Sequence, residues 1–310
     1  MPPVLADAAE RPMTENPGPD RREPSGPGAP WLEIVVPARN EESRLPAGLA
    51  RLCAKAAELP GHVAIIVVDS ASTDDTAGIV TRWPPSQVPV RLVRCTRPGK
   101  GVAVRAGLLA STAPYVGFCD ADMAADLSAV DEAIKLLLDG RPLVVGSRAH
   151  PASDVEDRHS VFRRAGATVF RAAARRVAPG VTDTQCGLKF FAGPVARAAA
   201  YNLSAPGFAF DIELIARCRQ LGAEPTEIPV RWHDVPGSTF SVWRHSLAAF
   251  IEIAAIRRAI RSPAAVPPEL AKAAAEAVTP GEPGDGNDAE RQPAGAADAG
   301  HVVPVTRALA

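Results

Sequence analysis

The chain has 310 residues, of which 46% are hydrophobic, and its 34 Lys and Arg residues nearly balance 35 Asp and Glu residues. The resulting formal net charge of −1 argues against a nucleic-acid-binding protein, because such proteins usually carry a basic excess. The five cysteines are odd in number and lack Cys-x-x-Cys spacing, so we interpret them as reduced thiols and not as a disulfide framework or a zinc site.

Composition divides the chain into a folded centre and two tails. Residues 1–30 are rich in Pro, Gly and charge, and residues 263–310 in Ala, Pro, Gly and Asp, so we expect both to be disordered. The centre then comprises one folded domain over 31–240 and an amphipathic helical segment over 241–262. No secretory signal is visible, and the apolar stretch 247–256 is far shorter than the roughly 20 residues that cross a bilayer. We expect a cytoplasmic protein, either free or peripheral at the cytoplasmic face of a membrane.

Strands and helices alternate through the first half of the folded centre. Short β-rich or continuously apolar runs predict strands at 31–37, 63–68, 90–93, 115–119 and 143–146. Helical spacing predicts helices between them, at 41–58, 77–82, 99–110 and 127–138. This alternation predicts an α/β fold in which a mostly parallel, doubly wound sheet is flanked by helices within a single domain.

The second half of the centre is less regular. We expect an arginine-rich helix over 161–177, a loop from Asp183 into a strand that reaches Phe191, a helix over 210–220, a strand over 227–232, and one long or two short helices over 241–261. Basic and apolar residues mix over 242–260, which is typical of helices that lie on membrane surfaces, although packing on the domain's own core is an equal alternative.

Polar residues follow the predicted strands. Asp69, Lys100, Asp120 and Arg148 each come directly after a strand or in the loop that follows it. Because ligands of doubly wound sheets bind beyond the carboxyl ends of the strands, we expect these four residues to lie at one binding edge.

Asp120 and Asp122 are separated by one small residue at the end of a buried strand. Such a pair suits Mg²⁺ or Mn²⁺, which are hard cations that share oxygen ligands with phosphates. A metal held there would neutralise the charge on a leaving diphosphate. The alternative is an ordinary surface turn, because the Asp-x-Asp pattern alone is common.

Four further residues have candidate binding roles. The carboxylate of Asp69 can accept a hydrogen bond from a nucleobase, or the Asp69 loop can simply cap the next helix. Lys100, between two glycines at a helix start, favours an anion over a merely solvated loop. Arg148 can clamp a phosphate. Asp211, just inside a helix N-terminus, can sense or deprotonate an acceptor, or serve only as a cap.

Taken together, the motifs resemble the family 2 glycosyltransferases of the GT-A (Rossmann-like) fold, and most of all the dolichyl- or polyprenyl-phosphate β-glucosyltransferase branch. The matching strings run in order over residues 31–240: Val36-Pro-Ala-Arg-Asn-Glu-Glu42, Val68-Asp-Ser-Ala-Ser-Thr-Asp74, Gly99-Lys-Gly101, Asp120-Ala-Asp122, Gly146-Ser-Arg148, Asp183-Thr-Gln-Cys-Gly-Leu-Lys189 and Phe210-Asp-Ile-Glu-Leu214.

The resemblance implies residue roles. It assigns the nucleoside to Pro37, Arg39, Glu41 and Asp69, the metal and diphosphate to Asp120 and Asp122, and donor or acceptor phosphates to Arg148, Arg163 or Arg164, and Lys189. Two departures stand out. Ser70-Ala71 replaces a frequent Asp-Gly after Asp69, and Arg39 replaces a frequent aromatic residue.

The function that we expect is an inverting, metal-dependent transfer of a hexose from a nucleoside diphosphate sugar to a polyprenyl or dolichyl phosphate. The resemblance favours glucose from UDP-glucose and leaves mannose from GDP-mannose open. One alternative is a glycosyltransferase that acts on a soluble hydroxyl acceptor, for which Asp211 would be needed as the base. Another is a nucleotide-sugar-binding protein without turnover. A nucleotidyltransferase is disfavoured, because no Gly-rich signature lies near the first strand. The sequence leaves the oligomeric state undefined.

Overall fold

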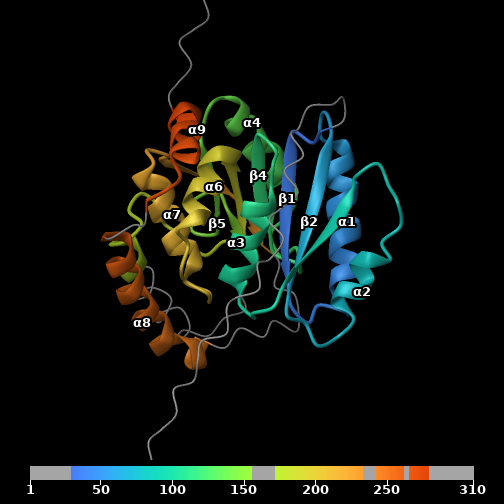
Figure 1. The fold of residues 1–310 in the computed structure, drawn as a ribbon, viewed down its shortest axis with the longest axis horizontal. Coiled ribbons are helices and arrows are strands. Elements are labelled where there is room, and N and C mark those ends of the chain that lie inside the picture. The colour runs from blue at the N-terminus through green and yellow to red at the C-terminus, as the bar shows by residue number, and fades with distance from the viewer. Residues whose placement is uncertain (1–28, 156–171, 233–241, 262–264, 279–310) are drawn as a thin grey trace, which may run out of the picture. The chain divides into compact units, whose positions relative to one another are not determined.

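A computed structural model describes residues 29–155, 172–232, 242–261 and 265–278. A seven-stranded sheet with the order β3-β2-β1-β4-β7-β5-β8 runs through its centre (Figure 1). All its strands are parallel except β7, which runs antiparallel to both of its neighbours. The strands are β1 Leu32–Ala38, β2 Val63–Ser70, β3 Val90–Cys95, β4 Tyr115–Cys119, β5 Leu143–Ser147, β7 Leu188–Ala192 and β8 Pro225–Pro229. A small second sheet pairs β6 Asp154–Val155 with β9 Arg231–Trp232.

Helices cover both faces of the large sheet. They are α1 Leu45–Glu58, α2 Thr76–Thr81, α3 Lys100–Ala110, α4 Ala129–Leu138, α6 Gly193–Tyr201, α7 Phe210–Gln220, α8 Val242–Arg261 and α9 Pro268–Val278. Successive side chains of a strand point to opposite faces, so Val35 of β1 enters the core beneath α3, α6 and α7, while Ile34 and Val36 enter the core beneath α1 and α4. The predicted α/β class, with a mostly parallel sheet flanked by helices, is confirmed.

Several sequence-based expectations need correction. The tail predicted to be disordered from residue 263 contains α9, whose Ala274 is fully buried against the core beside α6. The composition of this segment concealed a helical apolar stripe. The strand expected over 227–232 is two strands in different sheets, and α6 was not anticipated. The expected helix over 161–177 falls largely on residues 156–171, so Arg163 and Arg164 lie outside the described residues.

Within the described residues, no helix is both long and apolar enough to span a membrane. The expected helix over 241–261 is the single helix α8. All five cysteines are unpaired thiols, as predicted.

Among the described residues, three that are not glycine adopt left-handed backbone conformations, and each follows a strand of the large sheet. They are Asn40 after β1, Ala71 after β2 and Met123 after β4, with φ angles of 54°, 54° and 48°. Strained backbone of this kind concentrates at functional sites. The carboxyl edge of the sheet is therefore marked as a site by its backbone as well as by its side chains.

Replacing Ala71 with Gly is expected to raise the free energy of unfolding by about 0.5 to 1 kcal/mol. A left-handed conformation costs an L-residue roughly 1–2 kcal/mol, of which the greater chain entropy of glycine cancels only part. Equilibrium urea unfolding measures the change. The control is Ala54→Gly on the exposed face of α1, which is expected to destabilise the protein by about 1 kcal/mol. Equal destabilisation by both substitutions would show that Ala71 is unstrained.

Candidate active site

The carboxyl ends of β1, β2 and β4 bring acidic residues to one edge of the sheet. Asp69 is the next-to-last residue of β2 and is 7% exposed, and its Oδ1 accepts a hydrogen bond from Ser72 N at 3.1 Å. Asp120 directly follows β4, which is separated from β2 only by β1. At a strand spacing of about 4.8 Å, the two carboxylates are carried on strands about 10 Å apart. Glu41, in the loop after β1, pairs with Arg44 at 2.8 Å.

The ammonium group of Lys100 is bound directly to the first aspartate. Lys100 Nζ lies 2.6 Å from Asp120 Oδ1. Burial tends to lower the pKa of Lys100, but Asp120 and Asp211 outweigh it and raise the pKa above its usual value. Lys100 is therefore a fixed positive charge at this edge.

The glycines beside Lys100 serve packing. A Cβ on Gly99 would lie 2.4 Å from Pro206 O, and one on Gly101 would lie 2.1 Å from Ala205 O. Gly101 N already donates to Pro206 O at 3.0 Å, so this N–H is not free to bind a phosphate. Of the anion-binding features expected at this helix start, the structure therefore leaves only the positive charge of Lys100.

The site contains an excess of closely spaced carboxylates. The pKa of Asp122 is raised by burial and then by Asp120, and that of Glu41 is raised mainly by burial, with a further contribution from both aspartates. A divalent cation would relieve this repulsion, so the donor set fits Mg²⁺ or Mn²⁺. The described residues include no cluster of three or more side chains able to hold a metal alone. Phosphate oxygens of a ligand would complete the shell.

Gly187 is a site residue to which sequence analysis gave no role. Asp120 N donates to Gly187 O at 3.1 Å, and a Cβ on Gly187 would lie 2.0 Å from Asp120 Oδ2. Only glycine allows β4 and β7 to approach this closely around Asp120. The signal in the sequence that could have identified Gly187 was its position within the motif Asp183-Thr-Gln-Cys-Gly-Leu-Lys189.

Arg148 is held by a network that the sequence did not reveal. Its Nε and Nη2 atoms donate to the two oxygens of Asp183 at 2.7 and 2.9 Å. Glu227 of β8 anchors the Asp183 loop by accepting hydrogen bonds from Thr182 N at 2.8 Å and Asp183 N at 3.1 Å. The guanidinium carbon lies 4.8 Å from the centre of the Trp232 ring. This pairing raises the pKa of Arg148 further above its usual value, despite burial.

Lys189 and Asp211 form a buried ion pair beneath this edge. Lys189 Nζ donates to Asp211 Oδ1 at 2.6 Å and to Cys186 O at 2.7 Å. Lys189 is fully buried and Asp211 is 2% exposed. Burial raises the pKa of Asp211, and Lys189 opposes the rise. Lys189 therefore does not reach a surface where an acceptor phosphate would bind, in contrast to the role that the resemblance implied.

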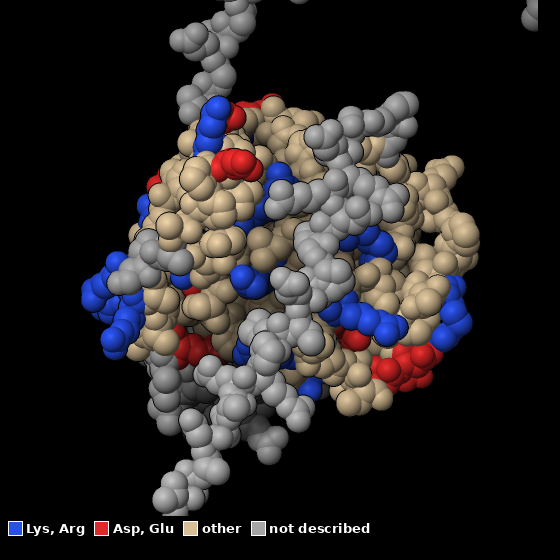
Figure 2. All heavy atoms as spheres, viewed as in Figure 1, with Lys and Arg blue, Asp and Glu red and all other residues tan. Residues whose placement is uncertain are grey.

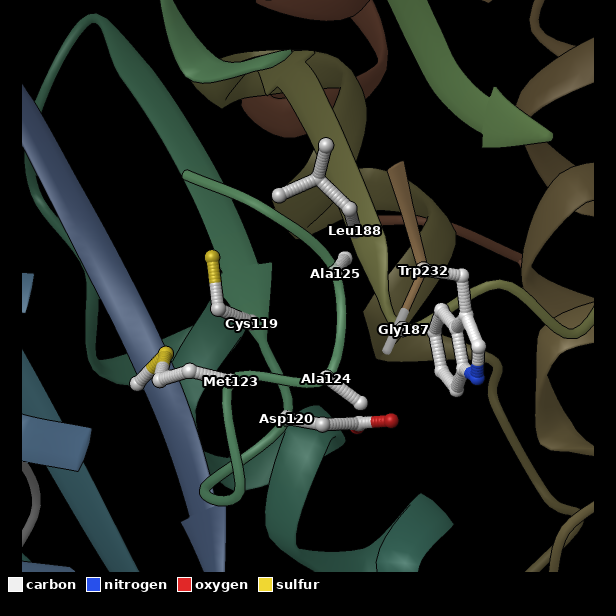
Figure 3. A pocket seen from close by; sticks show the side chains of 8 residues that line it. All are labelled: Cys119, Asp120, Met123, Ala124, Ala125, Gly187, Leu188 and Trp232. Atoms are coloured by element: carbon white, nitrogen blue, oxygen red, sulfur yellow. The ribbon is translucent and has the colours of Figure 1, made fainter. Parts of the chain in front are cut away.

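The remaining predicted nucleoside residues lie at the same edge. Pro37 is half-buried in β1, and Arg39 is exposed directly after it. Beside Asp120, a small cavity opens toward Trp232 (Figure 3). Its lining residues are Cys119, Asp120, Met123, Ala124, Ala125, Gly187, Leu188 and Trp232.

Comparison with known proteins agrees with this architecture. The model of the family described as glycosyl transferase family 2 matches residues 33–192. The chain is 31% identical over 242 residues to a dolichyl-phosphate beta-glucosyltransferase of Dictyostelium discoideum, which covers 73% of this chain and 74% of the relative. It is 32% identical over 268 residues to the Drosophila melanogaster protein of the same name, which covers 76% and 82%.

Solved structures of the same fold include glucosyl-3-phosphoglycerate synthase from Mycobacterium tuberculosis in complex with UDP. It matches with a TM-score of 0.52 at 22% identity, over 73% of this chain and 80% of that chain. This likeness establishes the GT-A fold. The chain belongs to glycosyl transferase family 2 and is a glycosyltransferase.

Proposed function

We propose that this enzyme transfers a hexose, with glucose favoured, from a nucleoside diphosphate sugar to a polyprenyl or dolichyl phosphate with inversion at the anomeric carbon. The observation that carries the proposal is the acidic carboxyl edge, where Asp120 and Asp122 lie beside the cationic Lys100. The two dolichyl-phosphate beta-glucosyltransferases similar to this chain support the acceptor class. Several solved structures of the fold contain Mn²⁺ and UDP-glucose, which supports a divalent metal and a uridine donor.

The donor would extend along this edge from one side to the other. Asp69, Pro37, Arg39 and Glu41 would contact the nucleoside, and Lys100 would contact the diphosphate. Mg²⁺ or Mn²⁺ held by Asp120 and Asp122 would supply charge neutralisation of the leaving diphosphate. Because Lys100 is already ordered against Asp120, its charge is in place before the reaction begins.

The state of Asp211 supports a phosphate acceptor. Its Oδ1 is bound to Lys189 and its side chain is almost wholly buried, so Asp211 does not present a free base to an acceptor. A phosphate acceptor needs no such base, because it is already an anionic nucleophile. Positioning and charge neutralisation then supply most of the rate enhancement. Arg148, and Arg163 or Arg164, would meet the acceptor phosphate.

A polyprenyl phosphate resides in a membrane, so the enzyme must work at a membrane surface. The C-terminal part of α8 exposes Arg257, Arg258 and Arg261. Figure 2 shows basic side chains gathered at the left edge of the molecule, where Figure 1 shows α8. Clustered arginines are attracted to anionic headgroups, and we place peripheral docking at the cytoplasmic face on this helix.

Direct assay tests the proposal. The protein is incubated with Mn²⁺, UDP-glucose and a polyprenyl phosphate in detergent, with GDP-mannose and a soluble hydroxyl acceptor in parallel arms. The expected product is a glucosyl polyprenyl phosphate. Donor binding without transfer or hydrolysis in any arm would instead favour a non-catalytic nucleotide-sugar-binding protein, and transfer only to the hydroxyl acceptor would refute the lipid-phosphate assignment.

A further inference from the structure

The cavity beside Asp120 is the one feature of the carboxyl edge that the proposed roles leave unassigned. Its walls are mostly apolar or small, and its polar group is the Asp120 carboxylate. In Figure 3 this carboxylate is directed toward the side on which the Trp232 indole lies, while the sulfur atoms of Cys119 and Met123 point away from it. Asp120 and Trp232 therefore face a common space, which has room for about one water molecule, so a hexose would lie at its mouth and not inside it.

The position of the cavity follows from the strand order. Asp69 lies on β2, Asp120 follows β4, and Trp232 belongs to β9, directly after β8 at the far edge of the sheet. A nucleoside diphosphate sugar is a linear ligand in which the diphosphate separates the nucleoside from the sugar. With the nucleoside at Asp69 and the diphosphate at Asp120, the sugar must extend away from β2, toward Gly187 and Trp232.

Trp232 is fixed to the loop that carries the aspartates. Ala125 forms an isolated antiparallel bridge with Trp232, and Asp126 N donates to Arg231 O at 2.9 Å. The Arg148 guanidinium, itself clamped by Asp183, lies 4.8 Å from the ring centre. The backbone of Trp232 is thus held by the loop after β4 and its indole ring by Arg148, and such preorganisation is usual in a residue that shapes a binding site.

We propose that the Trp232 indole forms the wall of the donor's hexosyl subsite and that Arg148 positions this indole through the Asp183 clamp. An aromatic face carries partial negative charge, and the C–H groups on the apolar face of a hexose present partial positive charge to it. The metal and nucleoside residues bind what all UDP-sugars share. Trp232 contacts the part by which one sugar differs from another. The inference rests on the proposed nucleotide-sugar donor and assigns one residue to its sugar.

The test compares two ligands that differ only by the sugar. Calorimetric dissociation constants for UDP and for UDP-glucose, each with Mn²⁺, are measured on the wild type, Trp232→Phe, Trp232→Ala and Trp83→Phe. Trp232→Ala is expected to weaken UDP-glucose binding about tenfold relative to UDP, and Trp232→Phe less than Trp232→Ala. UDP-glucose is also expected to change the tryptophan fluorescence of the wild type more than UDP does, and this difference disappears in Trp232→Phe.

The control variant Trp83→Phe and the ligand UDP distinguish loss of the sugar contact from misfolding. Trp83 contacts Cys53 of α1 and does not line the cavity, so Trp83→Phe should leave the ratio of the two affinities unchanged. A variant that misfolds loses both ligands, whereas loss of the sugar contact spares UDP. Equal effects on both ligands, or none, in both Trp232 variants would overturn the inference alone. If the wild type bound UDP but neither UDP-glucose nor GDP-mannose, the proposed donor would fail as well.

Discussion

Replacing Asp120 with Asn is expected to lower sugar transfer by about 10²- to 10³-fold, because it removes charge from the residue that joins the metal site to Lys100. Asparagine has nearly the same size as aspartate. It therefore fits the tight space beside Gly187, where even a Cβ on residue 187 would collide with the side chain of residue 120. The loss should therefore appear in turnover and not in folding. Initial rates at saturating donor measure it, and thermal unfolding of the variant checks that the structure is retained.

The control for this substitution is Asp131→Asn on α4. Asp131 is 57% exposed at its side chain and pairs with Lys55 of α1. The same chemical change is expected to leave turnover within about twofold of wild type, because a surface pair of this kind contributes little energy. If Asp120→Asn retained near-wild-type turnover, Asp120 would not hold the metal and the diphosphate, and the proposed chemistry would lose its basis.

The main features of the fold were predictable because they depend on local patterns. The continuous apolar run from Val63 to Val68 indicated a strand buried on both faces, and β2 is indeed buried throughout. The antiparallel direction of β7 was not predictable, because it depends on pairing with β4 and β5, which are distant in sequence, and no local pattern encodes such pairing. Helix α9 lies in a segment whose Ala- and Pro-rich composition resembles that of a disordered tail and conceals its helical apolar stripe.

The candidate site divides in the same way. Asp69, Lys100 and Asp120 were placed correctly at one edge, because the carboxyl ends of parallel strands meet there. Gly187, Asp183 and Trp232 act through contacts with residues distant in sequence, such as the 35-residue separation between Arg148 and Asp183. Spacing along a chain does not reveal such contacts. The phosphate role of Lys189 was implied by the family resemblance, and only the structure shows that this lysine is buried.

Removing one partner of the buried pair of Lys189 and Asp211 is expected to lower the free energy of unfolding strongly. Lys189→Met would leave the Asp211 carboxylate without its counter-charge at 2% exposure, and Cys186 O without its donor. Such breaks cost about 3–5 kcal/mol in the free energy of unfolding. Equilibrium urea unfolding of the variant measures the loss. The control Lys272→Met breaks an exposed surface pair on α9 and is expected to cost less than about 0.5 kcal/mol.

The double variant Lys189→Met/Asp211→Leu separates charge from packing. Replacing a whole buried pair with apolar groups is often nearly neutral, so the double variant should recover most of the stability that Lys189→Met loses. If recovery failed, the cost would lie in packing around Phe118, whose ring centre is 5.1 Å from Lys189 Nζ, and not in the unpaired charge. If the double variant recovered its stability but not its sugar transfer, the ion pair would be needed to hold α7 against β7 in the arrangement that the active site requires.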